Sequence, residues 1–163
     1  MKGVILEKRC CKLAWAMSFM LMFAAFTAQV SAHDHKSPKG KVTVSDAWAR
    51  ATFALAKTGA IYLDITNDSK RDVKLLKVRV ADTVASAAQL HETLMKDDMM
   101  QMRESEEGFL IAAGSKLSLQ SGGKHVMLMG LSKPLAVGDT FTLSLIFERN
   151  VVIRVPVTVK DGR

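Results

Sequence analysis

Ten short runs of β-branched or alternating apolar residues constrain the fold of this chain most, because a period of two is typical of half-buried strands. Clusters of Asn, Asp, Ser and Gly separate the runs and predict turns. The runs span residues 41–50, 59–66, 73–80, 85–94, 99–103, 109–112, 116–119, 125–131, 141–147 and 151–159. A helix competes only at residues 82–90, where Ala and Gln weaken the strand preference. Many short strands at regular spacing predict an all-β sandwich.

The first 32 residues have the pattern of a secretory signal peptide. Four basic residues precede an apolar run at 13–30, which ends in the small residues of Val30-Ser31-Ala32. Cleavage after Ala32 would leave a flexible leader at 33–40 and one folded domain at 41–160. An uncleaved anchor is the alternative, but the polar residues after Ala32 favour removal. The residues before Cys10 are not typical of lipoprotein processing, so we expect a periplasmic protein without a stable membrane anchor.

Cleavage would also change the charge and the thiol content of the chain. It removes four of the 23 basic and one of the 16 acidic residues, so the net charge becomes +4 instead of +7. Both cysteines, Cys10 and Cys11, are lost with the signal, which excludes a disulfide and a blue-copper centre with its thiolate ligand. Lys and Arg do not cluster among aromatic residues, so we expect no binding to nucleic acid.

Methionine and histidine are concentrated in one window of the predicted domain. All six methionines beyond the N-terminal apolar segment lie between Met95 and Met129, and the domain's two histidines, His91 and His125, lie in or next to this window. Thioether and imidazole together suit a soft ion, above all Cu(I), whereas Mg²⁺ and Ca²⁺ prefer oxygen ligands. The ordinary alternative is that methionine fills gaps in the core. Because both histidines have methionines at strand-compatible offsets, we favour a Cu(I) site.

The first pair of candidate ligands lies on a predicted β-hairpin. If the hairpin closes over Lys96-Asp97, His91 lies opposite Met102, and closure over Lys96-Asp97-Asp98 shifts the partner by one residue. Side chains opposite each other have Cβ atoms about 4.5–5.5 Å apart. A metal ion could therefore join the imidazole and the thioether.

The second pair lies on a single predicted strand. His125 and Met127 are two residues apart, so their side chains project from the same face. Met129 continues this row, and Met100 shares the face of Met102, which makes both of them reserve ligands. If the strand meets the hairpin, two histidines and two methionines converge.

Several motifs resemble those of the periplasmic copper chaperones of the PCuAC family. They are His91-Glu92, Met99-Met100-Gln101-Met102-Arg103, Gly122-Gly123-Lys124-His125-Val126-Met127-Leu128-Met129-Gly130-Leu131, Pro134-Leu135, Ala47-Trp48-Ala49-Arg50-Ala51-Thr52 and Gly59-Ala60-Ile61-Tyr62-Leu63. The resemblance covers about residues 42–158, and the spacing of His, ten residues and Met, followed by His-x-Met, is specific. There are two departures: one residue more than usual separates Met102 from His125, and Thr93 replaces a common methionine.

The resemblance implies a cupredoxin-like Greek-key β-sandwich that binds one Cu(I) through His91, Met102, His125 and Met127. It also implies copper supply to cytochrome c oxidase, with a recipient copper protein or an oxidase assembly factor as partner. We expect a monomer that is not an enzyme. The alternatives are a periplasmic copper-buffering or resistance protein, a copper redox enzyme, and an interaction module that binds no metal.

The predicted leader offers a separate copper hypothesis. Cleavage after Ala32 would expose His33-Asp34-His35, whose α-amine, two amide nitrogens and third-position imidazole can form a square-planar Cu(II) chelate. His33 and His35 are therefore candidate Cu(II) ligands. The alternative is a flexible tail with two incidental histidines, because the chelate requires cleavage at that one bond.

Overall fold

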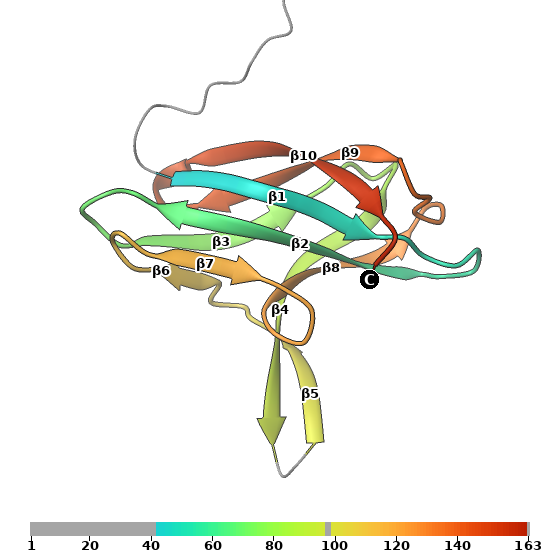
Figure 1. Cartoon of the computed structure of the whole chain (residues 1–163), viewed down its shortest axis with the longest axis horizontal. Helices are drawn as coiled ribbons and strands as arrows, with labels where there is room; N and C mark the ends of the chain where they lie inside the picture. The colour runs from blue at the N-terminus through green and yellow to red at the C-terminus, as the bar shows by residue number, and fades with distance from the viewer. Residues whose placement is uncertain (1–41, 97–98, 163) are drawn as a thin grey trace, which may run out of the picture. The chain divides into compact units, whose positions relative to one another are not determined.

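The computed structural model describes residues 42–96 and 99–162, most of which form β-strands (Figure 1). Within these ranges the strands are β1 (Val42–Arg50), β2 (Thr58–Asn67), β3 (Val73–Arg79), β4 (Ala85–Lys96), β5 (Met99–Glu104), β6 (Phe109–Ile111), β7 (Lys116–Leu119), β8 (His125–Leu131), β9 (Thr140–Phe147) and β10 (Val152–Lys160), with a 3-10 turn, η1, at Glu148–Asn150. Each predicted run corresponds to one strand. In the same ranges no helix is long and apolar enough to cross a bilayer. The predicted signal peptide and leader lie outside the described residues.

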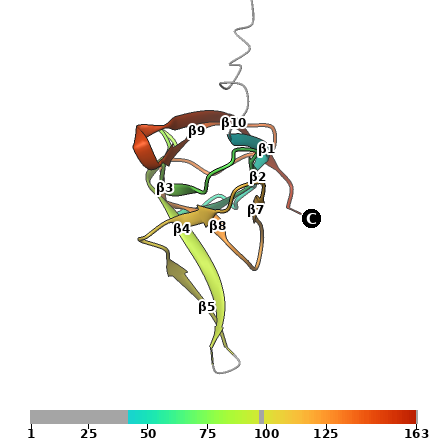
Figure 2. The same cartoon turned by 90° about the vertical axis from the view of Figure 1, so that its left-hand side faces the viewer.

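The strands form one hydrogen-bonded path in the order β5-β4-β8-β2-β1-β10-β9-β3-β6, and β7 pairs with β2. β1 and β10 are parallel, whereas the other pairs are antiparallel. Strands far apart in sequence are neighbours here, as in Greek-key folds. Figure 2 shows the path folded into two layers, with β9 and β10 in one and β4 and β8 in the other. The predicted all-β sandwich is confirmed.

Alternation along the central strands decides which side chains enter the core. On β2, Ile61, Leu63 and Ile65 are at most 2% exposed, and on β8 Val126 and Leu128 are fully buried. Successive residues of a strand point to opposite faces. His125, Met127 and Met129 of β8 and the neighbouring Gln89 and His91 of β4 therefore project from the outer face of the sandwich, where three of the four candidate metal ligands lie.

A bulge in β1 changes this alternation beside the same outer face. Asp46 has φ 53°, and the pairing of β1 with β2 shifts by one residue between Ser45 and Trp48. An extra residue reverses the faces of all residues that follow it. Ala49 consequently points into the core, and Trp48 lies outside against Tyr62, with ring centroids 4.8 Å apart.

The β4–β5 hairpin extends away from the sandwich (Figure 1). β4 pairs with β8 between Ala85 and His91, and beyond His91 it pairs with β5 alone. None of the described residues in this outer part belongs to the buried core. The hairpin is therefore a projecting arm whose base lies at the two histidines.

Candidate metal centre

The two histidines of the domain are direct neighbours across β4 and β8. His91 and His125 are paired residues, and their ring centroids are 5.9 Å apart with an angle of 41° between the planes. For Zn²⁺ the metal–nitrogen distance is about 2.0–2.1 Å, so two imidazoles on one ion of this size have centroids about 5–6 Å apart. The pair is thus spaced to share a metal ion with little movement.

Backbone contact determines which nitrogen of His125 is available. Nδ1 of His125 lies 3.1 Å from the carbonyl oxygen of Gly123. Because a carbonyl only accepts, Nδ1 must carry the hydrogen and donate it. In the neutral ring, Nε2 then has a free lone pair. The side chain is held firmly as well, since the residue is only 5% exposed.

A chain of side-chain hydrogen bonds determines which nitrogen of His91 is available. Gln89 donates from Nε2 to Oε2 of Glu104 at 2.8 Å, which fixes the orientation of its amide. Its Oε1 therefore faces Nε2 of His91 at 3.3 Å, and that nitrogen donates. Nδ1 of His91 is left without a proton. It is buried, and it has no hydrogen-bond partner among the described residues.

Burial keeps the imidazole of His91 neutral. Its pKa is lowered from 6.5, mainly because burial disfavours the charged ring and secondarily because His125 is close, while the carboxylate of Glu104 acts in the opposite direction. A neutral ring with an unpaired buried nitrogen can accept a metal ion without first losing a proton.

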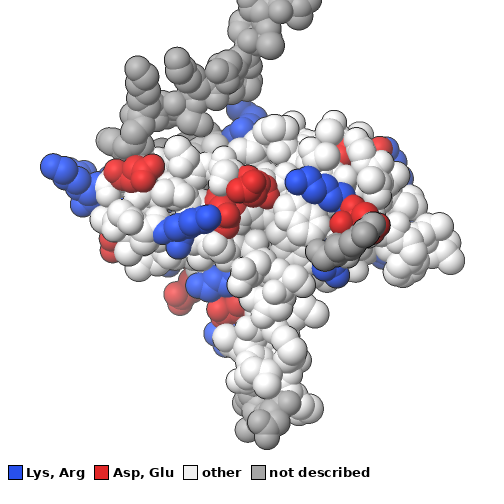
Figure 3. Space-filling model, viewed as in Figure 1, with Lys and Arg blue, Asp and Glu red and all other residues white. Residues whose placement is uncertain are grey.

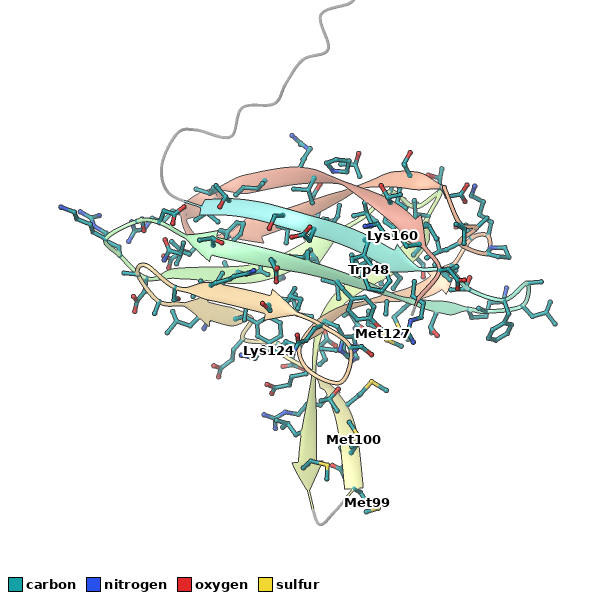
Figure 4. The ribbon with its side chains drawn as sticks, in the orientation of Figure 1. Trp48, Met99, Met100, Lys124, Met127 and Lys160 are labelled. Atoms are coloured by element: carbon teal, nitrogen blue, oxygen red, sulfur yellow. The ribbon has the colours of Figure 1, made fainter. Side chains whose placement is uncertain are left out.

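Two methionines lie on the same face as the histidines. Met127 is two residues beyond His125 and is paired with Gln89 on β4, and Met102 on β5 is paired with Thr93. Figure 4 shows Met127 on the sandwich near the base of the hairpin. A groove of about 660 Å³ is lined by the side chains of His125, Met127, Met102 and Thr93, among others. His91 lies beside His125 but is not among the lining residues.

The predicted hairpin register is wrong, by two residues for closure over Lys96-Asp97 and by one for closure over Lys96-Asp97-Asp98. Lys96 pairs with Met99, so the hairpin closes between these residues, and His91 lies opposite Glu104 rather than Met102. On β4 the pairing extends to Lys96, one residue further than either closure predicted. A shift of two preserves the face, so His91 and Met102 are diagonal neighbours, about 7–8 Å apart between the backbones.

The methionines of the hairpin are on the surface, so the alternative that they pack in the core is wrong. Met95, Met99, Met100 and Met102 are each at least 60% exposed. Of the two reserve ligands, Met100 lines the groove, whereas Met129 is 36% exposed and is not among the lining residues. In the described part of the chain, no group of three or more His, Cys, Asp or Glu side chains is placed to hold a metal.

Sequence reasoning missed the supporting residues. Gln89 could have been found as the residue two before His91 on the same strand face, but Glu104 depends on the hairpin register. The loop between β1 and β2 also lines the groove, with Phe53 75% and Leu55 83% exposed. Nothing in the local sequence of that loop indicated its position.

Comparisons with known proteins identify relatives of this chain. The family model described as "Putative lipoprotein LpqE-like" matches residues 42–159. A curated relative, "Putative lipoprotein Lxx21020" of Leifsonia xyli subsp. xyli, is 39% identical over 120 residues, which are 74% of this chain and 70% of the relative. The family match spans both the sandwich and the hairpin.

Solved structures give the same result. Cu(I)-bound DR1885 from Deinococcus radiodurans is 29% identical, covers 78% of this chain and 83% of its own, and has a TM-score of 0.60. The apo form of DR1885 is 32% identical with a TM-score of 0.59, covering 77% of this chain and 83% of its own. The apo PCuAC domain of PmoF1, at 24% identity, shares the fold over 77% of this chain and 98% of its own, with a TM-score of 0.62. The resemblance to the PCuAC family and the cupredoxin-like β-sandwich are therefore confirmed.

Proposed function

The chain belongs to the LpqE-like family, and from this membership and the geometry of the site we propose that it is a periplasmic Cu(I) carrier without catalytic activity. We propose His91, Met102, His125 and Met127 as the ligands. The observation that carries the proposal is the direct pairing of two imidazoles beside two thioethers on one face of the sheet. The Cu(I)-bound state of DR1885, a protein with the same fold, supports the choice of ion.

The donor set explains why Cu(I) is preferred over other ions. The two thioethers are neutral and polarisable, so they are poor ligands for Ca²⁺, which binds oxygen, and for Zn²⁺, which binds thiolate, imidazole or carboxylate. Cu(I) is soft and has a single charge, and it accepts neutral sulfur. Nε2 of His125 and Nδ1 of His91 supply the two nitrogen ligands in this proposal.

Unequal exposure of the ligands suits transfer to another protein. His125 is 5% exposed and Met102 is 65% exposed. An incoming thiolate or imidazole would therefore displace Met102 first, while the histidines still hold the ion. Each copper–ligand bond that breaks is replaced by one from the recipient. Copper stays in the Cu(I) state, so no electron acceptor is required.

The proposed destination follows from the family resemblance. We propose that the chain is exported with residues 1–32 removed, acts as a monomer, and supplies copper to cytochrome c oxidase or to an assembly factor of that enzyme. The relatives described as lipoproteins support export to the cell envelope. A protein that only buffers copper would use the same site, but it would retain Cu(I) in the presence of a recipient with copper-binding thiolates.

The direct test is Cu(I) competition against a chromophoric chelator at neutral pH. Wild type is compared with His91→Asn, His125→Asn, Met102→Leu and Met127→Leu, because leucine keeps the volume of methionine but lacks the sulfur. We expect each variant to lose affinity, and the histidine variants to lose most. Met129→Leu is the matched control on β8, and it should bind as wild type does.

Circular dichroism and thermal melting would show that each variant keeps its fold. Wild-type affinity in the four variants, or an equal loss in Met129→Leu, would contradict the proposed ligands. Transfer is tested separately, by mixing the Cu(I)-loaded protein with a soluble oxidase domain that contains the copper-binding thiolates. Copper retention in that mixture would favour buffering over delivery.

A further inference from the structure

The outer half of the hairpin exposes methionine far beyond the proposed Cu(I) site. Met95 is 69% and Met100 64% exposed, and both lie nearer the hairpin end than Met102. Figure 4 shows Met100 on the projecting arm, well away from Met127. Large apolar side chains at such positions contribute little to the core, and they reduce solubility. The exposure of these methionines therefore requires an explanation.

The hairpin register gathers these side chains on one face. Met95 is paired directly with Met100, and the next pair on that face is Thr93 with Met102. Directly paired side chains have Cβ atoms about 4.5–5.5 Å apart, so two flexible thioethers can reach one ion. Met99 is paired with Lys96, and by strand alternation it lies on the opposite face.

The spacing along the face leads toward the histidines. Residues two apart on a strand are separated by about 6.4–6.8 Å, which is within the combined reach of two methionine side chains. The pair Met95–Met100 is one such step from Met102, and Met102 is one further step from the level of His91. Among the described residues, Figure 3 shows few charged side chains on the visible side of the arm beyond its base.

We propose that Met95 and Met100 form a second, outer Cu(I) site, from which Met102 passes the ion to the paired histidines. The proposal rests on the proposed function, since the inner site is the destination of the ion. A site of two neutral thioethers without nitrogen would be weak and open, which suits capture of Cu(I) from a donor protein. In each step a bond from copper to Met95 or Met100 is replaced by one to Met102, and then nitrogen ligands are added. Copper remains Cu(I) throughout, and no proton or electron is released.

The test uses Ag(I), a soft ion that does not undergo redox chemistry under these conditions, and NMR spectra of protein labelled at the methionine methyl groups and the histidine rings. We expect the first equivalent to shift the signals of Met127 and Met102, together with the histidine rings. Further Ag(I) should then shift the signals of Met95 and Met100. In Met95→Leu/Met100→Leu, the first set of shifts should remain and the second should disappear.

Met99→Leu is the matched control, because Met99 is similarly exposed but lies on the other face of the same hairpin. It should retain both sets of shifts. The proposal is overturned if excess Ag(I) leaves the signals of Met95 and Met100 unchanged, or if it shifts Met99 as strongly. Failure of the proposed function has a different signature, because the histidine and Met127 signals would then not respond to the first equivalent.

Discussion

Replacing Gln89 with leucine should weaken Cu(I) binding although Gln89 is not a proposed ligand. The side chain connects Glu104 to His91 through hydrogen bonds of 2.8 Å and 3.3 Å, and it keeps the hydrogen of the imidazole on Nε2. Leucine has a similar size but offers no acceptor. The ring of His91 would then be free to rotate and to place its hydrogen on Nδ1, the nitrogen that we propose as the copper ligand.

The expected effect can be estimated from these contacts. A neutral hydrogen bond contributes about 1 kcal/mol net, and 3.3 Å is a long one, so its loss alone would lower the affinity about fivefold at most. Loss of the preferred tautomer adds to this, and removal of the partner of a metal-binding histidine typically costs about 10–100-fold. We therefore expect Gln89→Leu to bind Cu(I) about tenfold more weakly than wild type. Glu104→Gln, which can still accept from Gln89, should lose less.

The assay is the same chelator competition, combined with thermal melting. Gln101→Leu is the control, because Gln101 is paired with Leu94 on the opposite face of the hairpin. Equal affinities for Gln89→Leu, Gln101→Leu and wild type would refute the argument that the hydrogen-bonded chain positions His91. A folded Gln89→Leu protein with reduced affinity, beside an unchanged control, would support it.

Three further predictions concern the apo protein, its stability and its leader. In an NMR pH titration His91 should have a pKa below 6.5, and Glu104→Gln should lower this pKa further. Because the folded state prefers the neutral ring, the stability from this preference is present above the ordinary histidine pKa. It is lost as the pH falls through the lowered pKa of the folded state. Asn67→Ala should reduce the free energy of unfolding in urea by about 2–4 kcal/mol with unchanged Cu(I) affinity, because its fully buried amide donates to three backbone carbonyls. One equivalent of Cu(II) should give a weak visible band with protein that begins at His33, and blocking its α-amine should abolish the band. A band that persists after blocking would refute the His33-Asp34-His35 chelate.

Strand positions were predictable because the period-two pattern is a local property of the sequence. Ala and Gln made residues 82–90 ambiguous, yet the segment from Ala85 onward is strand, since pairing with β8 outweighs a weak local preference. The hairpin register was not predictable to the residue. Several closures of the turn are compatible with the same alternation, and a shift of two residues preserves every face.

The amino-acid sequence by itself determined the chemistry of the candidate site: two imidazoles, several thioethers and no thiol outside Cys10 and Cys11 of the N-terminal segment. It also determined the faces, because His125 and Met127 are separated by the two-residue period of a strand. Only the tertiary structure decided that His91 is paired with His125, which nitrogen of each ring is free, and that Gln89 and Glu104 orient one of them. These features depend on which strands become neighbours and in which register. Long-range pairing is set by packing of the whole sandwich, which no short segment encodes.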